Sequence, residues 1–199
     1  MVPKLRPSDD VVRTLRLLHE VGISDAIIAG GYVRDLFHDV IYTDVDIFVR
    51  GTAELRNESQ LPAFWTKTLN LKPRSSLLSD QIQRVGGSSG SGGAGNSRGL
   101  LHVWDVFKDE VPYQIIVLDD IDPIQFVEER FDFGLCQAFF DGKRMRFLNG
   151  FLQDSLNKTI TMQPGLKRSH QRQAINDHLP RIKQKYPGFT VVLPIETML

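Results

Sequence analysis

The sequence predicts an α+β domain in which a small mixed or antiparallel sheet is flanked by helices and followed by a short C-terminal helical appendage. Three observations predict this class: short strand-like apolar runs, amphipathic helical patterns between them, and a basic stretch near the C-terminus. The 199 residues are 41% hydrophobic, so the chain can bury a sizeable core. We therefore assign residues 1–162 to one domain and residues 163–199 to a basic helical segment.

The first part of the chain predicts two helices and two strands. Ser8 can cap the first helix, in which apolar residues recur at helical spacing until Gly22 ends it. Gly30 and Gly31 make a turn that lets the backbone approach a ligand closely. The other elements are a buried strand over residues 26–29, a short helix over 33–37 and a strand over 41–49.

The middle of the chain is less regular. Residues 52–71 predict a helix whose regular part begins near Pro62, and residues 77–85 are compatible with a strand. Residues 86–99 are rich in glycine and serine and predict a flexible connector. A natural mobile loop and an engineered replacement both fit that composition.

The second half of the chain predicts a hairpin, a helix, a further strand and a basic helix. Residues 164–186 carry the basic helix, interrupted near Pro180, and its cations form either a solvated face or a surface that attracts RNA. The remaining elements are strands over 100–107 and 111–118 joined by 108–110, a helix over 123–129, a turn at Asp141-Gly142, a strand over 143–148 and a loop or short turn over 149–156.

Two aspartates in the second strand carry the most distinctive chemistry. Asp44 and Asp46 are two residues apart, so on an extended strand both side chains leave the face opposite the aliphatic stripe. Adjacent carboxylates repel one another, and burial costs roughly several kcal/mol per ion unless a cation compensates. A hard divalent ion such as Mg²⁺ is the simplest partner, and a surface strand with solvated acids is the alternative.

Composition excludes several classes of protein. Lys plus Arg and Asp plus Glu each number 24, so the net charge gives no argument for bulk attraction to nucleic acid. Cys136 is the single cysteine, which excludes an intrachain disulfide and a cysteine zinc cluster. No apolar run approaches the roughly 20 residues of a membrane span, and the N-terminus does not resemble a signal peptide. We therefore expect a soluble, cytoplasmic protein without a membrane partner.

Three blocks occur in a defined order. They are Gly30-Gly31-Tyr-Val-Arg34-Asp35 followed by Asp44-Val-Asp46, then Arg130-Phe131-Asp132-Phe133-Gly134-Leu135-Cys136, then Gly150-Phe-Leu-Gln-Asp154-Ser-Leu156 followed by Ile160. Together they resemble the signatures of polymerase-beta-like nucleotidyltransferases, and the nearest branch is the head domain of class II tRNA CCA-adding enzymes and bacterial poly(A) polymerases. The resemblance covers residues 8–162 and implies the nucleotidyltransferase fold.

The resemblance also implies roles for the first block. Asp44 and Asp46 would bind two Mg²⁺ ions, an arrangement that suits in-line phosphoryl displacement. Gly30 and Gly31 would present backbone N–H groups to the triphosphate of an NTP. Arg34 would contact phosphate or hold Asp35 in place, although an ordinary ion pair on a helix surface is the alternative for these two residues.

The second block and a later strand combine matches with departures. Arg130 and Asp132 would meet the sugar and phosphates of the nucleotide, unless Asp132 caps a helix that starts at the next residue. Gln114 occupies the position comparable to a third acidic residue and brings no charge. Phe131 stands where the family has a second arginine, and Cys136 stands where it has an asparagine.

The leading functional hypothesis is a template-independent, Mg²⁺-dependent nucleotidyltransferase. It would bind an NTP such as ATP, move the NMP to a hydroxyl, with an RNA 3′ end as the first choice of acceptor, and release pyrophosphate. The resemblance thus points to tRNA processing or poly(A)-polymerase-like activity.

Two alternatives stay open. The same transfer to a protein or small molecule is motivated by the length, because 199 residues cannot hold the neck, body and tail domains of a full CCA-adding enzyme. A degenerate nucleotide- or RNA-binding module without catalysis is motivated by Gln114, Phe131 and Cys136. A panel of acceptors separates the first alternative, and NTP binding without turnover would favour the second.

Overall fold

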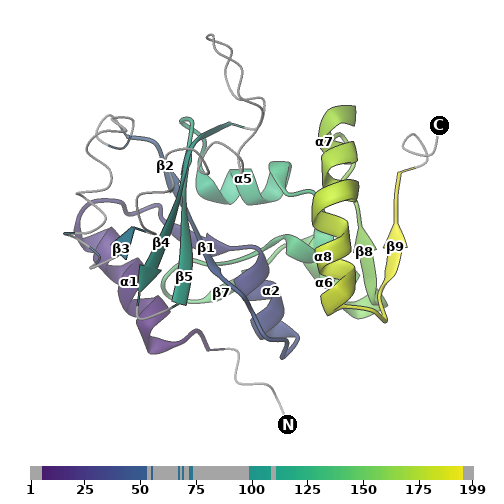
Figure 1. Ribbon diagram of the computed structural model, residues 1–199, viewed down its shortest axis with the longest axis horizontal. Coiled ribbons are helices and arrows are strands. Elements are labelled where there is room, and N and C mark those ends of the chain that lie inside the picture. Colours follow the sequence, from purple (N-terminus) through teal and green to yellow (C-terminus); the bar gives the residue numbers. More distant parts are fainter. Residues whose placement is uncertain are drawn as a thin grey trace.

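The computed structural model describes residues 6–52, 55, 67, 69, 72–73, 99–108 and 111–194 (Figure 1). The helices are α1 (Asp9–Glu20), α2 (Gly31–Phe37), α5 (Pro123–Arg130), α6 (Asn149–Asn157), α7 (Arg168–Gln173) and α8 (Leu179–Lys185), with a 3-10 turn η1 (Gly134–Cys136) and a π turn η2 (Ala174–His178). The strands are β1 (Ile27–Ala29), β2 (Val45–Arg50), β3 (Lys72–Pro73), β4 (Leu100–Lys108), β5 (Val111–Leu118), β6 (Ala138–Phe140), β7 (Met145–Phe147), β8 (Thr159–Thr161) and β9 (Thr190–Val192).

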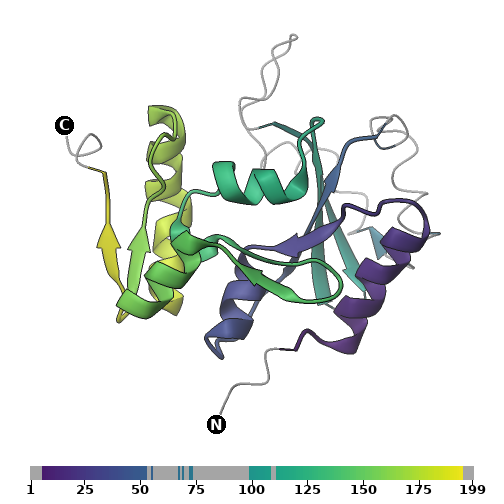
Figure 2. The ribbon, with the colours of Figure 1, turned by 180° about the vertical axis from the view of Figure 1, so that it is seen from behind.

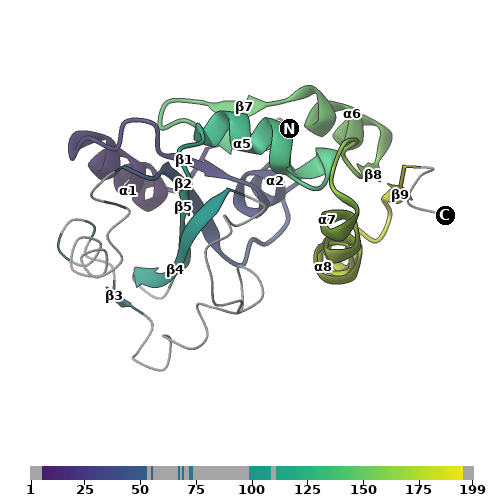
Figure 3. The same ribbon diagram turned by 90° about the horizontal axis from the view of Figure 1, so that it is seen from above.

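Seven of these strands form one mixed sheet in the order β3-β4-β5-β2-β1-β6-β7. Only β2 and β5 pair in parallel within it, and the other neighbours are antiparallel. The predicted α+β class with a mixed sheet is therefore confirmed. Strands β8 and β9 form a separate parallel pair. Figure 3 shows this pair and α7–α8 at the opposite end of the molecule from α1.

Helix α1 covers one face of the sheet. The Ser8 side chain caps it by accepting the backbone N–H of Val11, as predicted. Leu15 and Leu18 are fully buried and belong to the same cluster as the aliphatic side chains of β2 and β5. Because the aliphatic face of β2 is taken up by this cluster, the carboxylates of the same region face the other way.

Helix α5 covers part of the opposite face, where it lies across the sheet in Figure 2. The Asp122 side chain caps it by accepting the N–H groups of Ile124 and Gln125. Phe126 and Phe48 lie in a second apolar cluster beneath the helix. The aspartates and Gln114 lie beside the part of this face that the helix covers, where they line a cleft together with Phe126.

A third cluster joins the C-terminal segment to the preceding chain. It contains Phe133 and Leu135 from before residue 162 and Ile182 and Tyr186 from after it. Asp154 fixes the nearby strand β8, because its carboxylate accepts three hydrogen bonds, two from the hydroxyl groups of residues 159 and 161 and one from the backbone N–H of residue 161. The boundary at residue 162 stays a prediction, but these apolar contacts cross it.

Two sequence predictions were wrong in detail. The second strand begins at Val45 instead of residue 41, and Ile41 is 87% exposed. Residues 149–157 form α6 instead of a loop, because Phe151 is fully buried against the first cluster and stabilises the helix. The residue that precedes α6, Leu148, makes no side-chain cap, so the usual start signal is missing from the sequence.

Other predictions were confirmed or lie outside the described residues. The strands at residues 100–118 pair as an antiparallel hairpin, and the basic helix is interrupted by the π turn η2 just before Pro180. Residues 67 and 69 of the predicted helix 52–71 are helical, whereas most of that helix, residues 77–85 and residues 86–98 lie outside the described residues. No helix in the described part of the chain is long and apolar enough to cross a membrane.

Candidate active site

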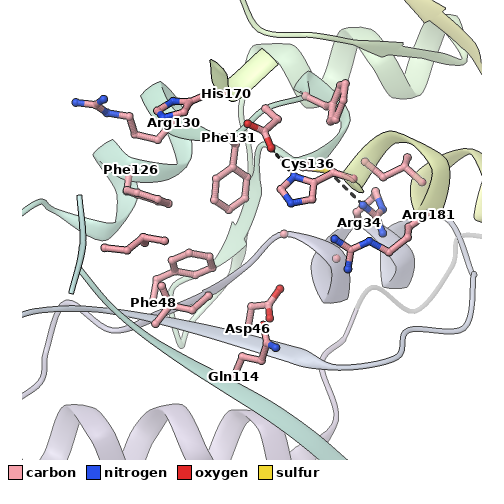
Figure 4. Close-up of a pocket in the computed structure, with 18 of the residues that line it drawn as sticks. Arg34, Asp46, Phe48, Gln114, Phe126, Arg130, Phe131, Cys136, His170 and Arg181 are labelled. Atoms are coloured by element: carbon pink, nitrogen blue, oxygen red, sulfur yellow. Dashed lines mark hydrogen bonds and ion pairs between the residues drawn. The ribbon is translucent and has the colours of Figure 1, made fainter. Parts of the chain in front are cut away.

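A cleft of about 590 Å³ opens on the face of the sheet that α1 does not cover. Its lining combines residues of the predicted head domain with residues of α7, η2 and α8. Figure 4 shows Asp46 and Gln114 on the strands at its floor, with Arg34 and Arg181 on one side and Phe48 on the other. The cleft has the size of a small-molecule site.

The glycine turn lies directly beside Asp46. Gly30 follows β1 and precedes α2 with φ 77° and ψ −129°, a backbone conformation that only glycine adopts without strain. A Cβ at Gly30 would lie 3.5 Å from Asp46 Oδ2 and 3.6 Å from the Phe131 ring. Gly31 begins α2, and a Cβ there would lie 3.7 Å from Arg34 Nη2. The turn therefore brings the backbone, an arginine and the carboxylate to one place.

Asp46 carries a buried carboxylate oxygen at the floor of the cleft. Its Oδ1 atom is buried and has no hydrogen-bond partner within the described part of the protein. Burial, followed by the nearby Asp44 carboxylate, raises the pKa of Asp46 to about 7, while Arg34 and Arg181 oppose this rise. Asp44 lies one residue before β2 and accepts a hydrogen bond of 3.0 Å from Thr43 Oγ1.

This pair fits a divalent cation. An orphaned buried carboxylate oxygen next to a second carboxylate is the donor set that Mg²⁺ prefers, completed in such sites by water and substrate phosphates. Among the residues that the structure describes, no group of three or more His, Cys, Asp or Glu side chains is placed to hold a metal ion. A cation here would thus depend on Asp44 and Asp46 and on its substrate.

Gln114 continues the polar row across the sheet. It pairs in register with Asp46 on β2 and with Asp105 on β4. Its Nε2 atom donates a hydrogen bond of 2.9 Å to Asp105 Oδ1. An acidic side chain therefore does lie on a later strand, one strand farther from Asp46 than the position that the family resemblance indicates. Asp105 was not among the residues predicted from the sequence, and the register of the predicted hairpin is the signal that places it beside Gln114.

Arg34 and Asp35 occupy different environments. Arg34 lines the cleft, with Nε donating to Asp35 Oδ1 at 2.7 Å and Nη1 donating to Cys136 Sγ at 3.3 Å. Asp35 is fully buried and is not among the lining residues. Its carboxylate also accepts hydrogen bonds from Lys185 Nζ and Tyr186 Oη. Asp35 therefore connects α2 to the end of α8, and its predicted contact with nucleotide stays untested.

Arg130 and Asp132 lie at the rim of the cleft. Arg130 is exposed at the end of α5. Asp132 Oδ2 lies 2.5 Å from His178 Nδ1, and both residues line the cleft. The alternative that Asp132 caps a following helix is wrong, because Phe133 is the residue before η1 and no side chain caps that turn. Asp132 instead links the head to η2.

The fold can be compared with solved structures. The Thermotoga maritima CCA-adding enzyme complexed with tRNA matches with a TM-score of 0.56 and 18% identity, over 96% of this chain and 42% of that one. The Bacillus stearothermophilus CCA-adding enzyme in complex with CTP matches with a TM-score of 0.56 and 16% identity, over 94% of this chain and 41% of that one. A tRNA-processing enzyme in an apo form matches with a TM-score of 0.58 and 15% identity, over 97% of this chain and 46% of that one.

The chain therefore shares the fold of the matching part of these CCA-adding and tRNA-processing enzymes. No protein-family model and no curated protein sequence matches it. The chain spans less than half the length of the solved proteins that it matches. Because the identity is only 15–18%, this likeness establishes the fold alone.

The lining residues that were not predicted from the sequence include one face of η2 and α8. His178, Arg181, Ile182 and Lys185 line the cleft and are spaced i, i+3, i+4 and i+7 along η2 and α8. The positive charge of Arg181, across the cleft, favours the ionised form of Asp46 and so opposes the rise in its pKa. The helical spacing in the basic run was the signal that could have identified this face.

Proposed function

We propose that this protein is a Mg²⁺-dependent nucleotidyltransferase that moves an NMP from an NTP to a hydroxyl at an RNA 3′ end and releases pyrophosphate. The observation that carries the proposal is the buried, unpartnered Oδ1 of Asp46, next to Asp44 and at the floor of the cleft. A buried carboxylate oxygen that has no hydrogen-bond partner among the described residues favours a cation that arrives with the substrate.

The two aspartates, the glycine turn and two arginines of the cleft each have a role in this reaction. Asp44 and Asp46 would hold Mg²⁺, which supplies positive charge to phosphate oxygens in such transfers. The Gly30 turn admits the triphosphate close to the backbone, since a side chain there is disfavoured. Arg34 and Arg181 oppose its negative charge, and a guanidinium can bind a phosphate group through two hydrogen bonds.

The nucleotide sugar would lie near Asp132 and His178. Both residues line the cleft, and their mutual contact fixes the imidazole ring. Arg130 on the exposed rim provides a further cation for phosphate. The RNA acceptor is supported by the nature of the proteins with the same fold, which are CCA-adding and tRNA-processing enzymes.

Transfer from labelled NTPs tests the proposal directly. Wild-type protein with Mg²⁺ and a panel of RNAs, proteins and small hydroxyl compounds should label an RNA. The double variant Asp44→Asn plus Asp46→Asn should lose this transfer, because each amide keeps the shape of the side chain and removes its charge. Asp39→Asn is the matched control, since Asp39 is exposed and does not line the cleft. Undiminished transfer by the double variant would exclude the proposed mechanism.

A further inference from the structure

The two sides of the cleft differ in chemistry. One side, which we call the aromatic wall, consists of Phe48, Phe126 and Phe131. The opposite side, the cationic wall, consists of Arg34, Arg181 and Lys185. Figure 4 shows the three phenylalanines, with Arg130 above them, on one side of Asp46, and Arg34 and Arg181 on the other. Asp35 neutralises one charge of the cationic wall, which leaves that wall positive.

Phe131 is the member of the aromatic wall that presents its ring to the cleft. Phe48 and Phe126 are only 5% and 6% exposed, whereas Phe131 is half-buried. The Phe131 ring centroid lies 5.5 Å from that of Phe48 and 6.1 Å from that of Phe126. These are ordinary distances between packed aromatic rings. The two buried rings therefore hold Phe131 in one orientation without covering it.

The same ring lies close to Asp46. A point at the Cβ position of Gly30 is 3.5 Å from Asp46 Oδ2 and 3.6 Å from Phe131 Cε2. The ring edge and the carboxylate thus both lie next to the glycine turn. A nucleotide whose base stacks on Phe131 can therefore place its own hydroxyl near Asp46.

In-line displacement decides which substrate meets which wall. The attacking hydroxyl and the leaving pyrophosphate lie on opposite sides of the phosphorus atom. The triphosphate belongs at the cationic wall because of its charge. The side of the aromatic wall is then left for the acceptor, and its rings can stack on nucleobases while Arg130 beside them can contact a backbone phosphate.

We propose that the aromatic wall is the acceptor subsite and that the terminal base of the RNA 3′ end stacks on Phe131, with its hydroxyl directed at Asp46. This inference rests on the proposed function and adds the acceptor's chemistry to it. Stacking on a ring depends on a planar base and not on its hydrogen-bonding edge. The acceptor is therefore selected by the presence of a terminal base, with little regard to which base it is.

Kinetics with Phe131→Leu tests the subsite. Stacking on an aromatic side chain is worth about 1–3 kcal/mol per base, so the KM for RNA should rise about 5- to 150-fold while the KM for NTP stays unchanged. Phe131→Tyr keeps the ring and should restore the KM for RNA. Phe147→Leu is the matched control, because Phe147 packs against Phe37 and Phe151 and does not line the cleft.

An RNA that ends in an abasic nucleotide provides the second test. Wild-type protein should lose affinity for this RNA, and Phe131→Leu should bind the abasic and the ordinary RNA equally. A rise in the KM for NTP instead would assign the wall to the incoming nucleotide, and unchanged constants would leave it without a role. Either result overturns the proposal.

A binding measurement separates this inference from the proposed function. In an RNA that ends in 2-aminopurine, the fluorescence of that base is quenched when the base stacks. The measurement requires no turnover. Quenching by wild-type protein that is absent in Phe131→Leu supports the subsite, even for a protein that transfers no nucleotide. Equal quenching by both proteins overturns it, even for one that does.

Discussion

Asp46 is a residue whose ionisation the fold opposes. Its pKa of about 7 in the folded protein exceeds the value of about 3.9 of an exposed aspartate. Between these two values the folded state binds more protons than the unfolded state. The free energy of unfolding therefore falls as the pH rises from about 4 to about 7. Bound Mg²⁺ would offset this loss, because it binds only the native arrangement.

Asp46→Asn should remove this dependence on pH. The variant carries no ionisable group at the position, so its stability relative to the wild type should increase by on the order of 2 kcal/mol between pH 5 and pH 8. Urea denaturation at the two pH values, without divalent ions, measures the difference. Asp39→Asn, at an exposed position, should leave it unchanged. Parallel stability profiles for wild type and Asp46→Asn would show that Asp46 ionises normally.

Mg²⁺ affinity should depend on the same proton. Below a pH of about 7 a cation has to displace the proton from Asp46, so affinity should increase about tenfold from pH 6 to pH 8. Calorimetric titration in two buffers of different ionisation enthalpy measures both the affinity and the proton released. Binding at pH 6 without proton release would contradict the role of Asp46 as a ligand.

Gln114 offers a further test at the polar row of the sheet. Gln114→Glu places a third carboxylate next to Asp46 and replaces the hydrogen bond to Asp105 with repulsion. The protein without cation should lose about 1–3 kcal/mol of stability, whereas its affinity for Mg²⁺ should increase. Asp105→Asn removes the repulsion and, combined with Gln114→Glu, should restore the stability. A variant that is no less stable would mean that Gln114 does not face Asp105 as described.

Local patterns in the sequence predicted part of the site. The alternation over residues 41–49 predicted that Asp44 and Asp46 share a face, and the glycine pair predicted the turn, because both features depend on neighbouring residues only. Asp105 and His178 depend on strand register and on contacts between distant segments. Asp105 becomes visible only when the two strands of the hairpin are aligned, and the helical spacing of the basic run marks the face of His178 without showing that it meets Asp132.

At the scale of elements, Asp35 connects α2 to α8. Its carboxylate accepts hydrogen bonds from Arg34 in α2 and from Tyr186 directly after α8. The guanidinium carbon of Arg34 lies 5.3 Å from the centroid of the Tyr186 ring. Burial raises the pKa of Tyr186, so the hydroxyl remains a donor throughout the working range of pH. This contact holds α8, and with it Arg181, at the edge of the cleft.

Substitutions in this contact should have graded effects on stability. Asp35→Asn leaves a buried guanidinium without its carboxylate and should cost about 3–5 kcal/mol. Tyr186→Phe removes one hydrogen bond and should cost about 1 kcal/mol. Lys185→Met, at a partly exposed position, should cost less than either. Chemical denaturation of the three variants ranks them, and an equal loss in all three would contradict the central position of Asp35.

Helices and strands with local signals were predicted well, and those stabilised by distant contacts were not. Ser8 marked α1, and the alternating runs marked the β4–β5 hairpin. The loop assigned to residues 149–156 is a helix, since Phe151 packs into a core formed by distant elements. Residue 41 looked like strand because of its side chain, but it lies before the pairing of β2 begins.

At the scale of the whole molecule, the C-terminal segment shares a core with the head. Phe133, Leu135 and Ile160 are buried partly by Ile182 and Tyr186. A chain that ends at residue 162 should therefore expose this cluster, bind a hydrophobic dye and lose solubility. A chain that ends at residue 194 is the control, because it keeps every residue of the cluster. A soluble, cooperatively folding chain of residues 1–162 would show that the boundary separates independent units.

The two walls of the cleft come from different stretches of the chain. The aromatic wall belongs to β2, α5 and the residue after α5, whereas two of the three side chains of the cationic wall belong to α8. A change in α8 can therefore alter the handling of the donor while leaving the acceptor surface intact, and the converse holds for Phe131. Donor and acceptor preference would then be free to diverge separately in evolution, which makes α8 the natural segment to exchange when engineering a new nucleotide choice.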